Sequence, residues 1–382
     1  MFNDEIWNVF LDYPHHMVTD HLENNIITHL KDFVSDFMDE KTIDDWIQNN
    51  LDDSLKELKL KRSYMTFMKT IEEQIACRCD IKEHIQHLQE LSQPEQRTPE
   101  WYDFRANHIT ASNAWKAYSE KEKVRNQIIY EKCKPMEVKK YGPSLSETPM
   151  TWGHKYEPLS VKLYEMWNDT TISEFGCIEH PKHKFLAASP DGIVTGNNNY
   201  GRMIEIKNVV SREINGIPKH DYYVQMQIQM EVCDLDDCDF VETKFTEYGS
   251  YEDYLKDGSF KLSLDEKQKG IIKVYIENEA YVYEYMNLSC SDPKKWLDEE
   301  PKEGWLKNVY WKLEVYSCVF VPRCKAWFDL TLNDIQDTWA IILKERESGD
   351  YMLRQPTKRV KKEEVHLTSC SVAEKDFEQS TC

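Results

Sequence analysis

The sequence predicts an α/β fold in which helices flank a mixed β-sheet, and two observations support this prediction. Within residues 98–246, segments with a helical spacing of apolar residues alternate with short apolar segments typical of strands. Hydrophobic side chains make up 40% of the chain and aromatic ones 12%, which is ample for a core. We also expect an added helical region at residues 1–95.

The elements of residues 98–246 are predicted in the order helix, strands, helix, strand. One helix should begin near Thr98, because Pro99 and Glu100 suit a first helical turn. A second should cover residues 151–167, where Tyr156 and Leu163 share an apolar face. The remaining predictions are strands at 171–180, 184–194 and 201–210, a helix from Pro218, a strand at 238–245, and a hairpin at 271–287.

The prolines in SQPEQRTPEW predict a domain boundary after the helical region 1–95. We expect a core domain at residues 96–250, its C-terminal part at 251–348, and a flexible tail at 349–382. The tail contains a basic cluster of Lys358, Arg359, Lys361 and Lys362. This cluster suits a nuclear localisation signal, a DNA-contacting tail or an ordinary solvated tail.

We expect the protein to stay inside a cell. The sequence contains neither an 18-residue apolar run nor the basic start of a signal peptide, so no membrane partner is expected. The net charge of −20 argues against broad, non-specific coating of DNA. It leaves room for a nuclease, because a local basic groove and divalent cations supply positive charge where phosphates react.

The stretch MIEIKN, residues 203–208, has the alternation of a strand. Ile204 and Ile206 should face a core, so Glu205 and Lys207 must share the opposite face. Upstream, Asp191 lies in the turn sequence SPDG, where two adjacent strands can bring it beside Glu205. An exposed face with a weak ion pair is the simpler alternative.

Phosphodiester hydrolysis needs such a set of groups. Asp191, Glu205 and the carbonyl of Ile206 are hard oxygen ligands suited to Mg²⁺, with Mn²⁺ as an alternative. Lys207 can orient the attacking water and stabilise the extra negative charge of the transition state.

Pro190, Asp191, Glu205 and Lys207 resemble the signature of the PD-(D/E)XK nuclease superfamily, which implies a restriction-endonuclease-like core. The order of further motifs is similar to the phage lambda exonuclease and YqaJ-like viral recombinase family of large DNA viruses. The resemblance implies that Glu157, in WGHKYEP, completes the acidic site. It also implies that the helix YYVQMQIQM presents a Gln to the site. Gln225 is the first match and Gln227 the second; alternatively these residues and Gln229 line a polar helix face.

FRANHITAS resembles the family element whose Arg and Ser bind a terminal 5′ phosphate. The resemblance assigns that role to Arg105 and Ser112, which we expect on one helix about two turns apart. An ordinary core helix is the alternative. The resemblance covers residues 98–246, and YWKLEVYSCVFVPRCKAWF, from Tyr310, is similar to the C-terminal part of such viral proteins.

The expected function is a Mg²⁺-dependent deoxyribonuclease, acting as a 5′→3′ exonuclease on duplex DNA ends in viral recombination, repair or replication. The alternatives are an endonuclease, an RNA-degrading relative, and a catalytically silent nuclease-fold binding module. A single-strand annealing or replication protein is a candidate partner, and both a ring-shaped homo-oligomer and a monomer remain open. The host cytoplasm, in a viral factory, and the nucleus are the candidate locations.

Overall fold

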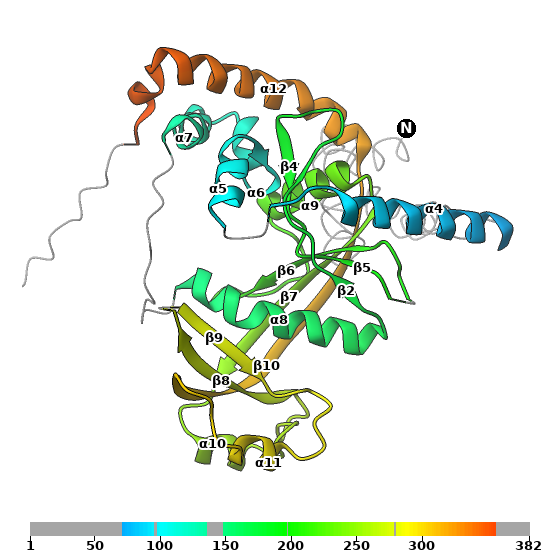
Figure 1. Cartoon of the computed structure of the whole chain (residues 1–382), viewed down its shortest axis with the longest axis vertical. Helices are drawn as coiled ribbons and strands as arrows, with labels where there is room; N and C mark the ends of the chain where they lie inside the picture. The colour runs from blue at the N-terminus through cyan, green and yellow to red at the C-terminus, as the bar shows by residue number, and fades with distance from the viewer. Residues whose placement is uncertain (1–70, 95–97, 136–147, 197, 279, 357–382) are drawn as a thin grey trace, which may run out of the picture.

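The computed structural model describes residues 71–356 except 95–97, 136–147, 197 and 279. A seven-stranded mixed sheet lies at its centre, with strand order β2-β5-β6-β7-β10-β8-β9 (Figure 1). Only β6 and β7 are parallel within this sheet; the other neighbouring pairs are antiparallel. The predicted mixed sheet flanked by helices is confirmed.

The strands of the large sheet are β2 (Ile172–Ser173), β5 (Gly192–Val194), β6 (Met203–Asn208), β7 (Asp237–Glu247), β8 (Lys269–Glu277), β9 (Ala280–Tyr285) and β10 (Trp305–Pro322). A small second sheet consists of β1 (Ile109–Thr110), β4 (Leu186–Ala188) and β3 (Ile178–Glu179), with β4 in the middle. The helices are α4 (Ile71–Glu90), α5 (Pro99–Ala106), α6 (Ala111–Ala117), α7 (Glu122–Cys133), α8 (Pro149–Asn168), α9 (His220–Cys233), α10 (Tyr251–Lys256), α11 (Pro293–Asp298), α12 (Lys325–Ser348) and the 3₁₀ helix η1 (Asp350–Arg354).

Helices cover both faces of β6 and β7. On one face, Ile204 and Ile206 pack with Tyr164 of α8, whose hydroxyl donates to Asp239 at 2.7 Å. On the other face, Met203 packs with α9 in the core that also includes parts of α6, α7 and α12 (Figure 1). Strand β6 is therefore buried from both sides, and a polar residue in it needs a partner.

The predicted N-terminal region 1–95 lies mostly outside the described residues. Its described part, α4, packs into the same core as the sheet: Ile85 and Leu88 are buried there. His84 Nε2 lies 2.7 Å from the carbonyl oxygen of Cys233. Residues 81–93 therefore pack as part of the core and not as a separate unit.

Two of the predicted strands are each divided in two. Segment 171–180 forms β2 and β3, and segment 184–194 forms β4 and β5, which lie in different sheets. Pro190 and Asp191 separate β4 from β5, and proline lacks the N–H that a continuous ladder needs. This break places Asp191 at the crossing from one sheet to the other.

The single helix predicted from Thr98 through Ser112 is wrong, because α5 and α6 are separate helices with β1 between them. Thr98 accepts from the N–H of Trp101 and begins α5 as expected. Asn107 ends α5, and Thr110 begins α6 in an extended conformation, with its N–H donating to the Asn113 side chain at 3.0 Å. The spacing of apolar residues in the sequence did not predict that one helix ends at Asn107 and another begins at Thr110.

The flexible tail predicted from residue 349 is wrong for its first residues. Gly349 ends α12 in the left-handed region, at φ +81°, and η1 follows. Arg354 then folds back and donates to both carboxylate oxygens of Glu345. Residues 357–382, with the predicted basic cluster, lie outside the described part.

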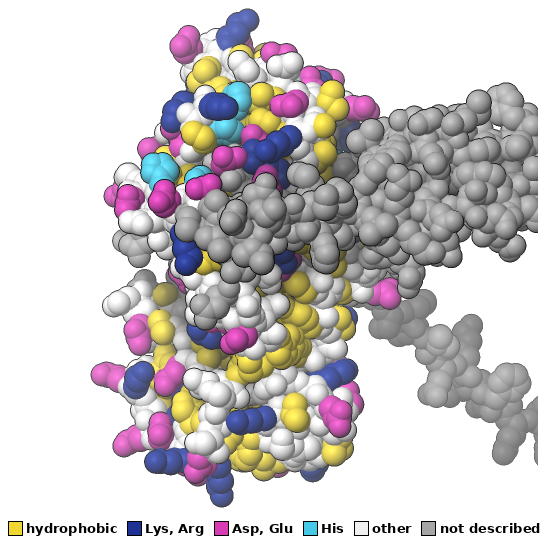
Figure 2. Space-filling view, turned by 90° about the vertical axis from the view of Figure 1, so that its right-hand side faces the viewer, with side chains coloured by type: hydrophobic (Ala, Val, Ile, Leu, Met, Phe, Trp, Pro, Cys, Tyr) yellow, Lys and Arg dark blue, Asp and Glu magenta, His cyan; other side chains and the backbone are white. Residues whose placement is uncertain are grey.

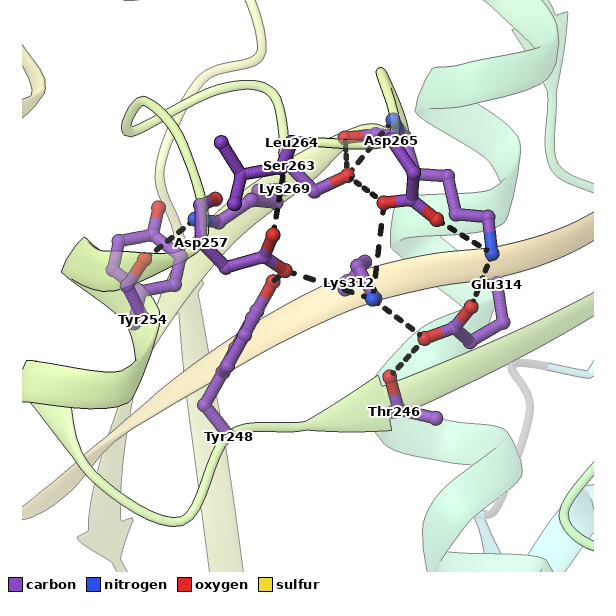
Figure 3. Close-up of polar contacts among 11 residues, drawn as sticks. Thr246, Tyr248, Tyr254, Asp257, Ser263, Leu264, Asp265, Lys269, Lys312 and Glu314 are labelled. Carbon is purple, nitrogen blue, oxygen red and sulfur yellow. Dashed lines mark hydrogen bonds and ion pairs between the residues drawn. The ribbon is translucent and has the colours of Figure 1, made fainter.

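The C-terminal part contains a dense polar network (Figure 3). Lys312 of β10 contacts Glu314 at 3.1 Å and Asp257 at 3.6 Å, while Tyr248 donates to Asp257 at 2.6 Å. The buried Lys269 donates to the carbonyls of Tyr254 and Asp257. These contacts hold the 257–268 segment against β10. The predicted hairpin is also confirmed, as β8 and β9.

The described surface mixes charges of both signs. In Figure 2, Lys and Arg side chains alternate with Asp and Glu over the face shown, with hydrophobic side chains between them. Among the described helices, none is long and apolar enough to cross a membrane.

Candidate functional site

The candidate site begins at an open edge of β6. Strand β5 pairs with β6 only at Ile204 and Met203 before the chain turns away at Asp191. The backbone N–H of Ile206 donates to Asp191 Oδ2 at 2.7 Å instead of to a neighbouring strand. Since the N–H and C=O of one strand residue point to the same side, the Ile206 carbonyl faces the side of Asp191 as well.

Glu205 is a fully buried carboxylate on this strand. One of its oxygens forms an ion pair with the ammonium of Lys207, so the two residues share a face as predicted. The other accepts from Gln229 Nε2 of α9 at 2.8 Å. The simple alternative, an exposed surface pair, does not describe Glu205, because a buried carboxylate is retained only with such partners.

Lys207 lies between the carboxylates and the surface. Burial acts to lower the pKa of its ammonium, but the charges of Glu205 and Asp191 outweigh burial, so the pKa is raised. Its Nζ lies 5.1 Å from the ring centre of Tyr222. The two carboxylates therefore favour the charged form of Lys207.

Asp191 is the carboxylate whose ionisation is most strongly opposed. Burial raises its pKa well above the usual value, and the charges of Glu205 and Glu157 add to the effect. Lys207 and the hydrogen bond from Ile206 act in the opposite direction. Glu157 reaches this site from the half-buried side of α8. The structure therefore brings together Asp191, Glu205, Lys207 and Glu157.

This donor set fits a hard divalent cation. Two carboxylates and a peptide carbonyl are oxygen ligands of the kind Mg²⁺ takes, and a cation would relieve the repulsion that raises the pKa of Asp191. The buried Gln229 Oε1 has no hydrogen-bond partner in the described structure. Within the described residues, no three His, Cys, Asp or Glu side chains already form a metal cluster, and Glu205 is engaged by Lys207 and Gln229.

The three glutamines of α9 have different surroundings. Gln229 contacts Glu205 and also donates to the Ser189 carbonyl at 3.1 Å. Gln227 instead accepts from the N–H of Cys324 and donates to the Pro322 carbonyl, which anchors the end of β10. Gln225 is half-buried and lies one helical turn before Gln229. The sequence comparison favoured Gln225, whereas the residue bonded to Glu205 is Gln229.

Arg105 and Ser112 meet across the break between α5 and α6. Arg105 Nη2 donates to Ser112 Oγ at 3.3 Å, and the guanidinium lies 4.4 Å from the ring centre of Trp101. Burial lowers the pKa of Arg105, and Cys177 lies beside it. Cys177 also interacts with Ser189, two residues before Asp191. Cys177 and Ser189 thus lie between Arg105 and the acidic site.

The sequence did not point to Lys132 of α7. Its Nζ donates to the Arg105 carbonyl at 2.5 Å, and Arg346 of α12 donates to the Lys132 carbonyl. Burial lowers the pKa of Lys132 to about 7, assisted by the positive charges of Arg105 and Arg346. Arg105, Lys132 and Arg346 therefore lie close together, and the charge of Glu131 acts on the pKa of Lys132 in the opposite direction.

Comparison with known proteins agrees with the sequence motifs. Residues 100–236 match the family model of the YqaJ-like viral recombinase domain. Uncharacterized protein R354 of Acanthamoeba polyphaga mimivirus is 28% identical over 307 residues, which cover 69% of this chain and 55% of that protein. The chain thus spans about half the length of this viral relative.

Two solved structures are also similar. The alkaline exonuclease LHK-Exo from Laribacter hongkongensis is 19% identical with a TM-score of 0.39, covering 67% of this chain and 98% of its own. A phage related exonuclease from Haemophilus somnus is 13% identical with a TM-score of 0.35. The match covers 64% of this chain and 96% of that exonuclease. The match over residues 100–236, a segment that contains Arg105, Asp191 and Glu205, agrees with the resemblance seen in the motifs: this segment is similar to the YqaJ-like viral recombinase domain.

Proposed function

We propose that this domain is a divalent-metal-dependent deoxyribonuclease that degrades duplex DNA from 5′-phosphorylated ends. The observation that carries the proposal is the meeting of Asp191, Glu205 and Lys207 at the open edge of β6. Asp191 precedes β5 while Glu205 and Lys207 lie on β6, and two neighbouring carboxylates in a buried place repel one another unless positive charge lies beside them.

The protein's own residues would perform two tasks at the scissile phosphate. Asp191, Glu205 and the Ile206 carbonyl would hold Mg²⁺, with Glu157 nearby; the ion supplies positive charge at the phosphate and acidifies the attacking water. Lys207, whose raised pKa keeps it protonated at neutral and alkaline pH, would orient that water and stabilise the charge that develops. Gln225 and Gln229 are the candidates for positioning the water and Glu205.

The polarity of degradation would come from Arg105 and Ser112. A guanidinium and a hydroxyl that already contact one another can both donate to a terminal phosphate. Because Cys177 and Ser189 link this pair to Asp191, a bound 5′ phosphate would lie close to the scissile bond. Such a pocket favours release of short products from a 5′ end.

The test is degradation of an end-labelled linear duplex with Mg²⁺, compared with the same duplex lacking the 5′ phosphate and with a closed circle. We expect rapid loss of the phosphorylated linear duplex, slower loss of the hydroxyl-ended one, and survival of the circle. Lys207→Met should reduce the rate by at least about 100-fold, because it removes a charge aimed at the transition state. Addition of EDTA should abolish the activity.

Lys162→Met is the matched control, since Lys162 is an exposed lysine of α8 paired only with Glu165. It should cleave at the wild-type rate. The proposal is wrong if Lys207→Met, folded as judged by circular dichroism, keeps activity within a few-fold of wild type. Equal rates on the closed circle and the linear duplex would refute the exonuclease part and favour an endonuclease.

A further inference from the structure

Three cations surround the ring of Tyr222, at the start of α9. Lys207 Nζ lies 5.1 Å from the ring centre, the Arg212 guanidinium carbon 5.8 Å, and Lys219 Nζ 6.0 Å. They come from β6, from the segment between β6 and α9, and from the residue that precedes α9. Tyr222 and Arg212 are half-buried and Lys219 is exposed, so this group opens to solvent beside Lys207.

Arg212 is fixed in this position by a buried carboxylate. Glu242 of β7 is opposite Lys207 in the parallel ladder, so both side chains lie on the same face of the sheet. One Glu242 oxygen forms an ion pair with Arg212, and the side chain is 1% exposed. Its other oxygen has no hydrogen-bond partner within the described structure. A buried, half-satisfied carboxylate is costly, and its evident use is to hold Arg212 beside Tyr222.

The group lies on the opposite side of the acidic site from the Arg105–Ser112 pair. Gln229, near the end of α9, contacts Glu205 and Ser189, whereas Tyr222 lies seven residues earlier, about 10 Å along the helix. Helix α6 runs between the same two places. Ser112 in its first turn contacts Arg105, and Tyr118 at its end contacts His220, which lies beside Tyr222 in α9. Arg105 and Ser112 therefore lie toward the Gln229 end of α9, and Tyr222, Arg212 and Lys219 lie toward its start, on the side of Lys207.

We propose that Tyr222, Arg212 and Lys219 form a strand-binding subsite for the nucleotides on the 3′ side of the scissile phosphate. This inference rests on the proposed function, which places the 5′ end at Arg105. Arg212 and Lys219 would contact successive phosphates of the strand being degraded, and the Tyr222 ring would pack against a base or sugar. The subsite would hold the shortened strand after each cleavage.

Binding without cleavage tests the subsite. The probe is a fluorescein-labelled, 5′-phosphorylated 12-base-pair duplex in EDTA, with affinity measured by anisotropy between 50 and 200 mM salt. Arg212→Gln with Lys219→Gln should weaken binding and reduce the slope of log affinity against log salt by about 1.8, since each phosphate contact contributes about 0.9. Tyr222→Leu should weaken binding about tenfold with little change in slope.

A second variant and a control variant distinguish the loss of a phosphate contact from misfolding and from a general loss of positive charge. Arg212→Gln leaves Glu242 buried and unpaired, so Arg212→Gln/Glu242→Gln, which keeps an amide pair without charge, serves as the second variant and should show the same loss of one contact. Lys162→Gln with Lys184→Gln, both exposed lysines, is the control and should bind as wild type. The proposal is overturned if the folded Arg212 and Lys219 variants keep wild-type affinity and salt slope.

The outcome also distinguishes this inference from the proposed nuclease. If wild type cleaves DNA but these variants bind and cleave unchanged, the subsite is wrong and the nuclease stands. If wild type cleaves no DNA, yet the variants lose binding as described, the nuclease is wrong and a nucleic-acid-binding surface at Tyr222 stands.

Discussion

Glu205 is more buried than the alternation of polar and apolar residues in its strand suggests. Alternation alone placed it on a polar strand face, where exposure would be natural. It is instead fully buried and bonded to Lys207 and Gln229. Burial of Asp191 raises the pKa of that carboxyl, and the charge of the neighbouring Glu205 adds to the rise. The pKa of Asp191 therefore depends on Glu205 as well as on its own burial.

Lys132 gives a pH-dependent prediction. Its pKa is about 7 in the folded protein, below the ordinary 10.5. Between these values the unfolded chain binds more protons at this residue, so its contribution makes stability rise with pH, by at most about 1.4 kcal/mol per pH unit. The Lys132→Met variant lacks this pH-dependent contribution to the free energy of unfolding. We expect the difference in unfolding free energy, wild type minus Lys132→Met, to increase from pH 7 to pH 9.

Urea unfolding at pH 7, 8 and 9 measures that difference. Using a difference removes the titration of groups that the two proteins share. Lys162→Met, which changes an exposed lysine, is the control for the loss of a lysine side chain as such. A constant difference for Lys132→Met would mean that Lys132 keeps an ordinary pKa when folded.

At the scale of elements, two short interruptions of helix and strand position the candidate site residues. The break at Asn107 to Thr110 turns one expected helix into α5 and α6, yet it still brings Arg105 to Ser112. The break at Pro190 and Asp191 delays the start of β5 to Gly192 and leaves the edge of β6 open beyond Ile204. Regular pairing there would have used the backbone groups of Ile206 that now face Asp191.

Gly192 tests the packing of β5. A Cβ at this position would lie 2.3 Å from Ile172 Cγ2 of β2 and 3.3 Å from Ile204 of β6. Gly192→Ala should therefore displace β5, lower stability by about 1–3 kcal/mol and reduce nuclease activity by moving the adjacent Asp191. Urea unfolding and the linear-duplex assay measure both effects.

Two matched variants make this prediction specific. Gly153 lies in α8 with open space around its Cβ position, so Gly153→Ala should leave stability unchanged or raise it by up to about 1 kcal/mol. Adding Ile172→Ala to Gly192→Ala removes the clashing methyl group and should recover activity. Failure of this double variant to recover would place the defect outside the β2–β5 contact.

At the scale of the whole molecule, a protein with a net charge of −20 must concentrate its positive charge to bind DNA. Arg105 and Arg346 lie close together beside Lys132, and Lys207, Arg212 and Lys219 lie around Tyr222. Elsewhere, as on the face in Figure 2, the two signs are mixed. The charge distribution therefore permits local binding of a strand despite an acidic average.

Divalent cations should stabilise the whole fold if the acidic site holds them. At about ten times the dissociation constant, Mg²⁺ should add about 1.4 kcal/mol and raise the melting temperature by about 2–5 °C. Asp191→Asn should lose most of this rise, because the site then lacks one anionic ligand. Differential scanning fluorimetry with and without Mg²⁺ measures the shift.

Asp298→Asn, which removes an exposed carboxylate of α11, should keep the wild-type rise. An equal rise in Asp191→Asn and wild type would show that Mg²⁺ acts on general surface charge.

The sequence by itself determined the regular elements and part of the site. Periodicity predicted α8, β6, α9 and the β8–β9 hairpin, and alternation put Glu205 and Lys207 on one face, because residue spacing along one element is a local property. The tertiary structure decided the partners: Gln229 rather than Gln225 for Glu205, Lys132 beside Arg105, and Glu242 beneath Arg212. These partners come from different elements, and only the packing of helices on the sheet determines which side chains meet.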